Sequence, residues 1–375
     1  MADTTVEMTL LSEADIIAAG ATDMAACVDT MEETFRLISA GDYRLAGHRQ
    51  ASHGSFITFP EHPIFPDMPV DGPDRRFIAM PGYLGGRYHM AGCKWYGSNA
   101  ENRAKGLPRS ILMLMLNDPD TGAPLALMSA NLISSYRTAA VPALAVRKLA
   151  RADCRTVGII GPGVMNKTTL RSFITERPMI EKVKVKGRGK RSLDAYVAYV
   201  RDNFPGVKVE VVQSEEDAIR GADLVSICTP ENGKAFFPYI SRAWVKPGAV
   251  ICCPSDVDTD RDPFRDGSWK MVADLFGMYE DWRDEFGRHG DGTGTLANIW
   301  VDMVDDGDID RASVLELGDI VAGKAPVRES EDDIIFFSIG GIPLEDISWG
   351  TTIYRQAIEA GIGQRFKVWD APALA

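Results

Sequence analysis

The stretch that decides the fold is Thr156-Val157-Gly158-Ile159-Ile160-Gly161-Pro162-Gly163-Val164-Met165-Asn166. A short apolar run leads into a Gly-x-Gly turn and then into a helix-like segment. The first glycine allows the tight turn, and the second lets the backbone pass close to a ligand. N–H groups at the helix start then face a pyrophosphate. We therefore predict a dinucleotide-binding turn that uses Gly161, Pro162, Gly163, Val164 and Met165.

The third position of this pattern is Asn166, where a glycine or alanine would allow closer packing of helix on strand. An ordinary strand–turn–helix unit is the alternative, and the following segments argue against it. Apolar strands are expected at 183–186, 207–212, 223–230 and 249–254, with helices at 192–203 and 214–221. Alternation of this kind is typical of an α/β, doubly wound Rossmann domain with a parallel sheet.

Composition narrows the class of protein. The chain has 375 residues, of which 45% are hydrophobic and 25% charged, and its net charge is −12. The length allows two domains. The acidic balance without a Lys/Arg block argues against a nucleic-acid partner on electrostatic grounds. No apolar run reaches the roughly 20 residues that span a bilayer. The acidic start lacks the features of a signal peptide, and the six cysteines lack metal-ligand spacing, so we expect a reduced, cytoplasmic protein without a metal.

The rest of the chain suggests a second domain. Residues 8–40 are expected to be helical, with helix starts at Ser12 to Asp15 and at Thr22 to Ala25. Residues 48–130 are expected to be rich in strands, and 134–150 to form a long helix leading into the nucleotide domain. After residue 325 we expect a strand, a turn at Gly340-Gly341 and a helix to Gly361. Because this tail is too small to fold alone, we place it on the first domain. The predicted domains are therefore 1–138 with 326–375, and 139–325.

Three basic residues outside the nucleotide domain stand out. Arg49 follows a loop, Lys94 lies in an apolar strand between Cys93 and Trp95, and Arg137 opens a helix of small residues. A lysine in an apolar strand is costly unless an anion meets it. The alternative for Lys94 is an edge strand from which the side chain extends to solvent.

These residues belong to a larger pattern, which resembles the ornithine cyclodeaminase/μ-crystallin family over nearly the whole chain. The segments that carry the resemblance, besides the three basic residues, are Asp118 to Pro124, Arg137-Thr138-Ala139-Ala140, Val157 to Gly163, Ala222-Asp223, Lys246-Pro247-Gly248, Asp256 and Gly341 to Asp346. Their order and spacing together are more specific than any single segment.

The resemblance implies a Rossmann domain and an α/β substrate and dimerisation domain, built from the N-terminal half and the C-terminal tail, in a homodimer. It implies reduction of an imine or oxidation of an amine of an amino acid with NAD(H) or NADP(H), with Arg49, Lys94 and Arg137 holding the substrate carboxylate. Asp256, just after a parallel strand, matches the catalytic aspartate, and Lys94 is its expected catalytic companion. A solvated loop acid is the alternative for Asp256. Further cofactor contacts are expected from Thr138, Cys228, Thr229 and Pro230.

Two departures from the family concern the substrate. Cyclodeaminases carry an acidic residue on the strand that matches Phe56 to Phe59, and this chain has none there. The segment Glu61 to Gly86 is longer than in short members and suggests a bulkier substrate. An imine reductase or amino-acid dehydrogenase is thus favoured over a cyclodeaminase, a crystallin-like NADPH-binding protein without catalysis, or an amine-oxidising component.

The end of the second nucleotide-domain strand bears on the cofactor. NAD enzymes place an acid there for the ribose hydroxyl, whereas this chain has Lys186-Gly187-Arg188-Gly189-Lys190-Arg191. Cations suit a 2′-phosphate, so Arg188, Lys190 and Arg191 favour NADP(H) over NAD. A solvated basic turn is the alternative.

Overall fold

The computed structural model describes residues 4–229, 234–326 and 328–374. It divides into two compact units, Met1–Arg137 with Ile342–Ala375, and Thr138–Gly341. Within the described residues, no helix is both long enough and apolar enough to cross a lipid bilayer.

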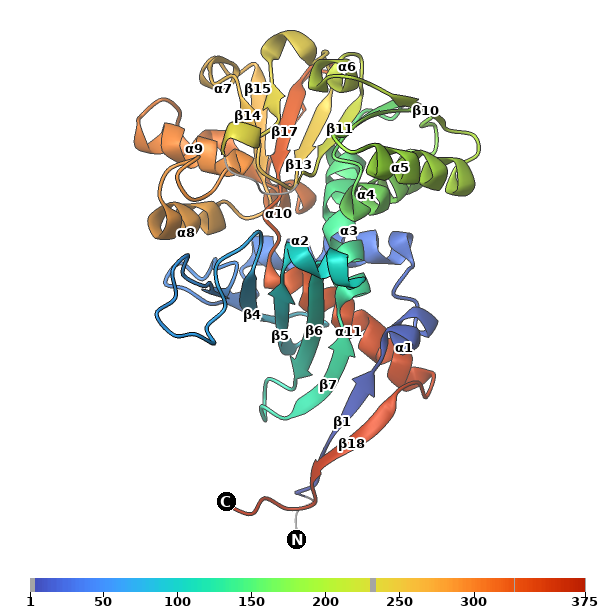
Figure 1. Cartoon of the computed structure of the whole chain (residues 1–375), viewed down its shortest axis with the longest axis vertical. Coiled ribbons are helices and arrows are strands. Elements are labelled where there is room, and N and C mark those ends of the chain that lie inside the picture. Colours follow the sequence, from blue (N-terminus) through green and yellow to red (C-terminus); the bar gives the residue numbers. More distant parts are fainter. Residues whose placement is uncertain (1–3, 230–233, 327, 375) are drawn as a thin grey trace. The chain divides into compact units, whose positions relative to one another are not determined.

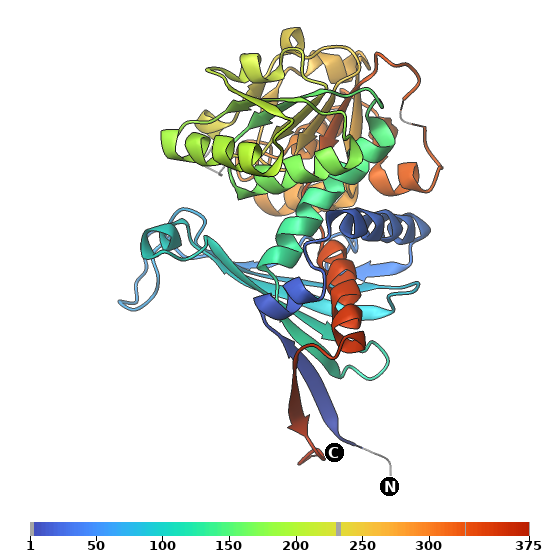
Figure 2. The same cartoon turned by 90° about the vertical axis from the view of Figure 1, so that its right-hand side faces the viewer.

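The first unit is a mixed sheet with helices packed on one face. Its strands follow the order β18-β1-β7-β6-β5-β4-β2, with β3 paired to β4. Its elements are β1 (Val6–Leu11), α1 (Glu13–Ala18), α2 (Met24–Ala40), β2 (Tyr43–Leu45), β3 (Ser55–Ile57), β4 (Arg76–Leu84), β5 (Met90–Ser98), η1 (Ala100–Lys105), β6 (Ser110–Asn117), β7 (Pro124–Ser129), the start of α3 (Asn131–Leu149), α11 (Pro343–Glu359) and β18 (Gln364–Trp369). Helix α11 packs on α2 and on β4, β5 and β6, and the two helices lie on the same side of these strands (Figure 2).

The start of the chain differs from its helical prediction. Residues Val6–Leu11 form β1, which pairs with β18 and β7, so the helices begin only after it. The expected helix starts are otherwise present, since Ser12 caps α1 in a capping box with Asp15 and Asp23 caps α2. Residues 6–11 form a strand because they pair with β18 and β7, which lie far along the chain. The local sequence pattern carries no information about these pairing partners.

The second unit is a parallel sheet of the Rossmann type, as predicted. Its strand order is β10-β9-β8-β11-β13-β17-β15-β16, and every pairing is parallel. Helices α4, α5, α8 and α9 surround the strands (Figure 1). The elements are β8 (Thr156–Ile160), α4 (Val164–Glu176), β9 (Lys182–Lys186), α5 (Lys190–Asn203), β10 (Lys208–Val211), α6 (Glu215–Ile219), β11 (Leu224–Ile227), η2 (Lys234–Phe236), β12 (Tyr239–Ile240), η3 (Arg242–Trp244), β13 (Val250–Cys253), β14 (Asp258–Thr259), α7 (Asp262–Arg265), β15 (Trp269–Ala273), α8 (Phe276–Phe286), α9 (Leu296–Asp305), η4 (Arg311–Ser313), β16 (Val314–Glu316), α10 (Leu317–Val321) and β17 (Ile334–Ser338).

The C-terminal tail is divided between the units, which corrects the expectation that all of 326–375 joins the first domain. Strand β17 lies between β13 and β15 in the parallel sheet, so the chain returns to the first unit only at Ile342. The residues Ile335 to Ser338 are buried, which makes β17 a central strand of this core. Only α11 and β18 pack on the first sheet.

Candidate active site

The glycine turn after β8 has the backbone that the sequence pattern requires. Gly161 has φ +93°, and a Cβ there would lie 2.0 Å from the carbonyl oxygen of Cys228. No other residue fits that position without moving the neighbouring strand end. Gly163 is the N-cap of α4, where no side chain caps the helix. The first-turn N–H groups of α4 are therefore not occupied by a capping side chain and can meet an anion.

Asn166 acts as an internal clamp for this turn. Its side-chain amide donates to the carbonyls of Ile160 at 3.0 Å and Gly161 at 2.8 Å. Its Oδ1 accepts from the hydroxyl of Ser226 on β11 at 2.7 Å. The side chain is fully buried. In place of the small residue common at this position, a hydrogen-bonded asparagine holds α4 to two neighbouring strands.

The basic segment after β9 faces solvent. Arg188, Lys190 and Arg191 are all exposed, and Lys190 pairs with Asp194 at 2.7 Å. A Cβ at Gly187 would come within 2.6 Å of Pro162, so the end of β9 passes directly against the glycine turn. The cations at the start of α5 therefore belong to the same edge of the sheet as the turn.

The remaining residues assigned to the cofactor, so far as the structure describes them, all lie in the second unit. Cys228 and Thr229 follow β11, where the Thr229 N–H donates to the Ser255 hydroxyl at 3.0 Å. Thr138, half-buried on α3, is the first residue of the second unit. Val164 is 71% exposed and Met165 is half-buried at the start of α4. Pro230 lies outside the described residues.

Lys94 and Arg137, far apart in the sequence, meet in a buried cluster of charges. Lys94 on β5 and Arg137 on α3 are 2% and 4% exposed, and both bind the first turn of α11. The Lys94 ammonium lies 2.7 Å from Oδ2 of Asp346, and the same oxygen lies 3.1 Å from Nη2 of Arg137. Arg137 also forms an ion pair with Glu345. Lys94 additionally donates to the Ser134 hydroxyl at 3.3 Å.

The electrostatics of this cluster depend on burial. The pKa of Lys94 is lowered to about 8, first by burial and second by the positive charge of Arg137. The carboxylate of Asp346 acts in the opposite direction. Burial also acts to lower the pKa of Arg137, but Asp346 and Glu345 outweigh it and raise that pKa. Two fully buried carboxylates balance these two buried cations.

Glu345 and Asp346 were not assigned a role from the sequence, although they lie in the segment that carries the family resemblance. The available signal was a pair of acidic residues in the first turn of a helix, a favourable position for negative charge. Such pairs are common on exposed helices, so only their burial marks these two as part of a site.

The remaining predicted site residues, Arg49 and Asp256, belong to different units. Arg49 lies exposed in the turn between β2 and β3. Asp256 belongs to the second unit, half-buried three residues after β13. Its neighbour Ser255 donates to the carbonyl of Ile227 at 3.1 Å, so this loop is tied to the carboxyl end of β11. Across the described ranges, no group of three or more His, Cys, Asp or Glu could hold a metal ion.

Comparisons with known proteins cover almost the whole chain. The sequence model of the ornithine cyclodeaminase/mu-crystallin family matches residues 21–361. The N-((2S)-2-amino-2-carboxyethyl)-L-glutamate dehydrogenase of Staphylococcus aureus is 30% identical over 366 residues, which are 97% of this chain and 99% of that relative. The alanine dehydrogenase of Archaeoglobus fulgidus is 29% identical over 77% of this chain and 83% of its own.

A solved structure supports the same likeness. The Delta(1)-pyrroline-2-carboxylate reductase of Thermococcus litoralis, in complex with NADH and L-proline, is 26% identical and superimposes with a TM-score of 0.77. The match covers 95% of this chain and 99% of that one.

Proposed function

Because this chain belongs to the ornithine cyclodeaminase/mu-crystallin family, we propose that it is an NAD(P)-dependent oxidoreductase that acts on a C–N bond of an amino acid or of its imine. Hydride would move between the nicotinamide and the substrate α-carbon. The observation that carries the proposal is the buried pair Lys94 and Arg137, held at one place in the first unit. The names of the relatives, dehydrogenases and reductases of amino acids and of a cyclic imine, support the same reaction class.

The substrate carboxylate is assigned to Lys94 and Arg137. A guanidinium offers paired donors to a carboxylate, and an ammonium adds a point charge beside it. Arg49 is exposed in the structure. Its proposed role as a third carboxylate ligand therefore rests on the family resemblance. Asp256 is proposed to carry the proton to or from the substrate nitrogen, from a position just past a parallel strand.

The residues of the second unit fit a dinucleotide. When bound, a nicotinamide dinucleotide supplies or accepts the hydride. Gly161 and Gly163 leave the backbone open to a pyrophosphate, and the uncapped start of α4 offers it N–H groups. We propose NADP(H) as the preferred form, because exposed cations and no acid occupy residues 187–191, directly after β9.

The cofactor preference is testable by fluorescence titration with NADPH and NADH. We expect NADPH to bind at least about tenfold more tightly, since a lost phosphate contact costs roughly 1.5–3 kcal/mol. Arg188→Ser should reduce the preference, whereas Lys182→Ser, at the other end of β9, should not. Equal affinities in the wild type would rule out the NADP(H) assignment.

The class of substrate is narrowed by β3 and by one relative. Ornithine cyclodeamination is disfavoured because β3, Ser55-Phe56-Ile57, offers no carboxylate to a second substrate amine. The substrate in the name of the Staphylococcus aureus relative is a secondary amine with two amino-acid halves. We therefore propose secondary-amine amino acids, or the imines that yield them, as the first substrates to try.

The reaction is best tested by a screen for NADPH oxidation with 2-oxo acids paired with ammonia, amino acids and diamino acids. Net NADPH consumption with at least one pair is expected, together with a C–N product detected by mass spectrometry. Lys94→Met should raise the apparent KM for the acid much more than the KM for NADPH. Cyclisation of ornithine without net NADPH use would instead indicate a cyclodeaminase.

We also propose that the chain forms a homodimer through the outer face of the first sheet. Trp95 on β5 lies opposite Met113 on β6 and stacks on Phe77 of β4, with ring centroids 5.8 Å apart. The exposed apolar side chains on this face are Phe77, Trp95, Ile111, Met113 and Met115. An apolar face of this kind marks a contact surface.

A further inference from the structure

Asp346 has a place in the charged cluster that neither the sequence pattern nor the proposed reaction assigns. Its Oδ2 is shared between the Lys94 ammonium at 2.7 Å and Nη2 of Arg137 at 3.1 Å. The two cations come from β5 and α3, so this single oxygen fixes their relative position. The carboxylate itself is 0% exposed at the start of α11.

Some buried polar atoms of this cluster lack a hydrogen-bond partner. Among the described residues, these atoms include Oδ1 of Asp346 and Nε of Arg137. A buried polar atom without a partner is destabilising, so an unpaired acceptor and an unpaired donor in one cluster need an explanation. A ligand that carries both an anionic acceptor and a cationic donor would satisfy both.

The charge balance points to the same kind of ligand. Lys94 and Arg137 contribute two positive charges, and Glu345 and Asp346 contribute two negative charges, so the cluster is neutral overall. A buried neutral cluster gains little from an added net charge, because desolvation of that charge opposes binding. An amino-acid head group, which adds one charge of each sign, keeps the balance, whereas a 2-hydroxy acid adds an unbalanced anion.

We propose that Asp346 is the specificity-determining residue of the carboxylate site, with Oδ2 aligning the two cations for the ligand carboxylate and Oδ1 accepting an N–H of the ligand nitrogen. The site thereby selects amino acids and protonated imines over 2-hydroxy acids. This inference rests on the proposed function in one respect, since it takes Lys94 and Arg137 as the carboxylate ligands.

The test compares L-alanine with L-lactate, a small pair that differs only in an ammonium group against a hydroxyl group. Binding to the full-length protein is measured by calorimetry at neutral pH, with and without NADP⁺. We expect wild type to bind alanine about tenfold or more tightly than lactate, the scale of one charge-assisted hydrogen bond. Asp346→Asn should weaken alanine binding about tenfold and leave lactate unchanged or tighter, because the cluster gains one net positive charge.

Glu345→Gln is the matched control. It removes the carboxylate that pairs with Arg137 and so adds the same net positive charge, but it keeps Oδ1 of Asp346. Lactate should respond as in Asp346→Asn, whereas alanine binding should not weaken. Equal affinities of wild type for the two ligands, binding of neither, or a parallel loss of both in Asp346→Asn would each overturn the proposal. If Asp346→Asn does not fold, the affinities of wild type for alanine and lactate still test the proposal.

Failure of the proposed reaction would look different. It would show as absence of turnover with every acid and amine pair, while calorimetric selection of alanine over lactate needs no turnover. The two conclusions can therefore fail separately.

Discussion

Lys94 shows how a single residue can be costly to the fold and useful to the site. Its ammonium is buried, and three charged neighbours decide how much of that cost remains. A lysine held this way is charged only over a limited pH range, and its ability to bind an anion is limited to the same range.

The pH dependence follows from the Lys94 pKa of about 8. Affinity for a carboxylate ligand should fall as the pH rises through about 8, because the ammonium then loses its proton. In Lys94→Arg, whose guanidinium stays charged, the affinity should change little over this range. Calorimetric titrations from neutral to alkaline pH measure both. A flat profile in wild type would show that the charge of Lys94 is not needed for binding.

The lowered pKa of Lys94 also makes the free energy of unfolding depend on pH. In the unfolded chain Lys94 has its ordinary pKa of 10.5, above the folded value of about 8. Between these values the unfolded state binds more protons, so the contribution of Lys94 to stability improves as pH rises. Below pH 8 its unfavourable contribution is complete. Relative to wild type, Lys94→Met should therefore become less stable as the pH rises from about 8 to 10.5.

Asp256 is a second residue whose role can be isolated. Asp256→Asn should lower turnover about 10²-fold or more, the usual scale for a lost acid–base group, and leave dinucleotide affinity nearly unchanged. Steady-state kinetics and a fluorescence titration measure the two effects. Asp258→Asn is the control, because Asp258 pairs with Arg261 at 2.8 Å in the same loop. Turnover at the wild-type level in Asp256→Asn would make Asp256 a solvated loop acid.

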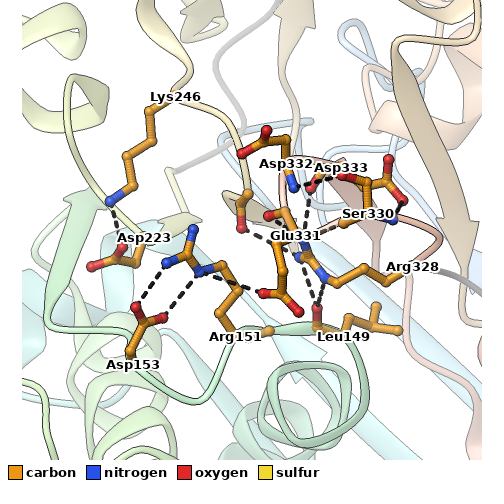
Figure 3. A network of polar contacts seen from close by, with 12 residues as sticks. Leu149, Arg151, Asp153, Asp223, Lys246, Arg328, Ser330, Glu331, Asp332 and Asp333 are labelled. Atoms are coloured by element: carbon orange, nitrogen blue, oxygen red, sulfur yellow. Dashed lines mark hydrogen bonds and ion pairs between the residues drawn. The ribbon is translucent and has the colours of Figure 1, made fainter.

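At the scale of elements, the end of α3 is held by arginines from elsewhere in the second unit. Arg328 donates to the carbonyl of Leu149, the last residue of α3, at 2.9 Å from Nη2 and 3.0 Å from Nε. It also binds the carbonyls of Gly248, Ser330, Glu331 and Asp333 (Figure 3). Arg177 binds the carbonyls of Val146 and Ala150. These contacts satisfy helix-end carbonyls that have no partner in the helix.

Arg328→Met should therefore destabilise the protein by roughly 2–4 kcal/mol, since several half-buried carbonyls lose their donors. Urea unfolding monitored by circular dichroism gives the change. Arg151→Met is the control, because Arg151 forms an exposed ion pair with Asp153 at 2.7 Å and should cost much less. Similar losses in both variants would mean that the carbonyl contacts of Arg328 contribute little.

At the scale of the whole molecule, the outer face of the first sheet predicts assembly. Met113→Lys places a charge in the middle of that apolar face and should weaken dimerisation at least about tenfold, or about 1.4 kcal/mol. Ile17→Lys, at a comparably exposed position on α1, should leave the dimer unchanged. Light scattering over a dilution series measures both. A monomeric wild type, or a dimer unaffected by Met113→Lys, would place the contact elsewhere or remove it.

The sequence by itself determined the features whose causes are local. Gly161 could be identified because a φ of +93° and a close backbone approach require glycine, and Ser12 and Asp23 because helix starts need side-chain acceptors. The repeated apolar strands also sufficed to predict the parallel sheet. Such signals depend on sterics and hydrogen bonds within a few residues, so they are visible in the chain alone.

Only the tertiary structure decided which distant segments meet. It placed β17 inside the Rossmann sheet and not with the first domain. The sequence could not predict this, because an apolar strand pattern does not indicate which strands it pairs with. It also joined Lys94 to Asp346 across 252 positions and Arg137 to Glu345 across 208. Whether a charge is exposed or buried depends on the packing of β5, α3 and α11 together. The neutral buried cluster is therefore a property of the fold that no segment of the sequence contains by itself.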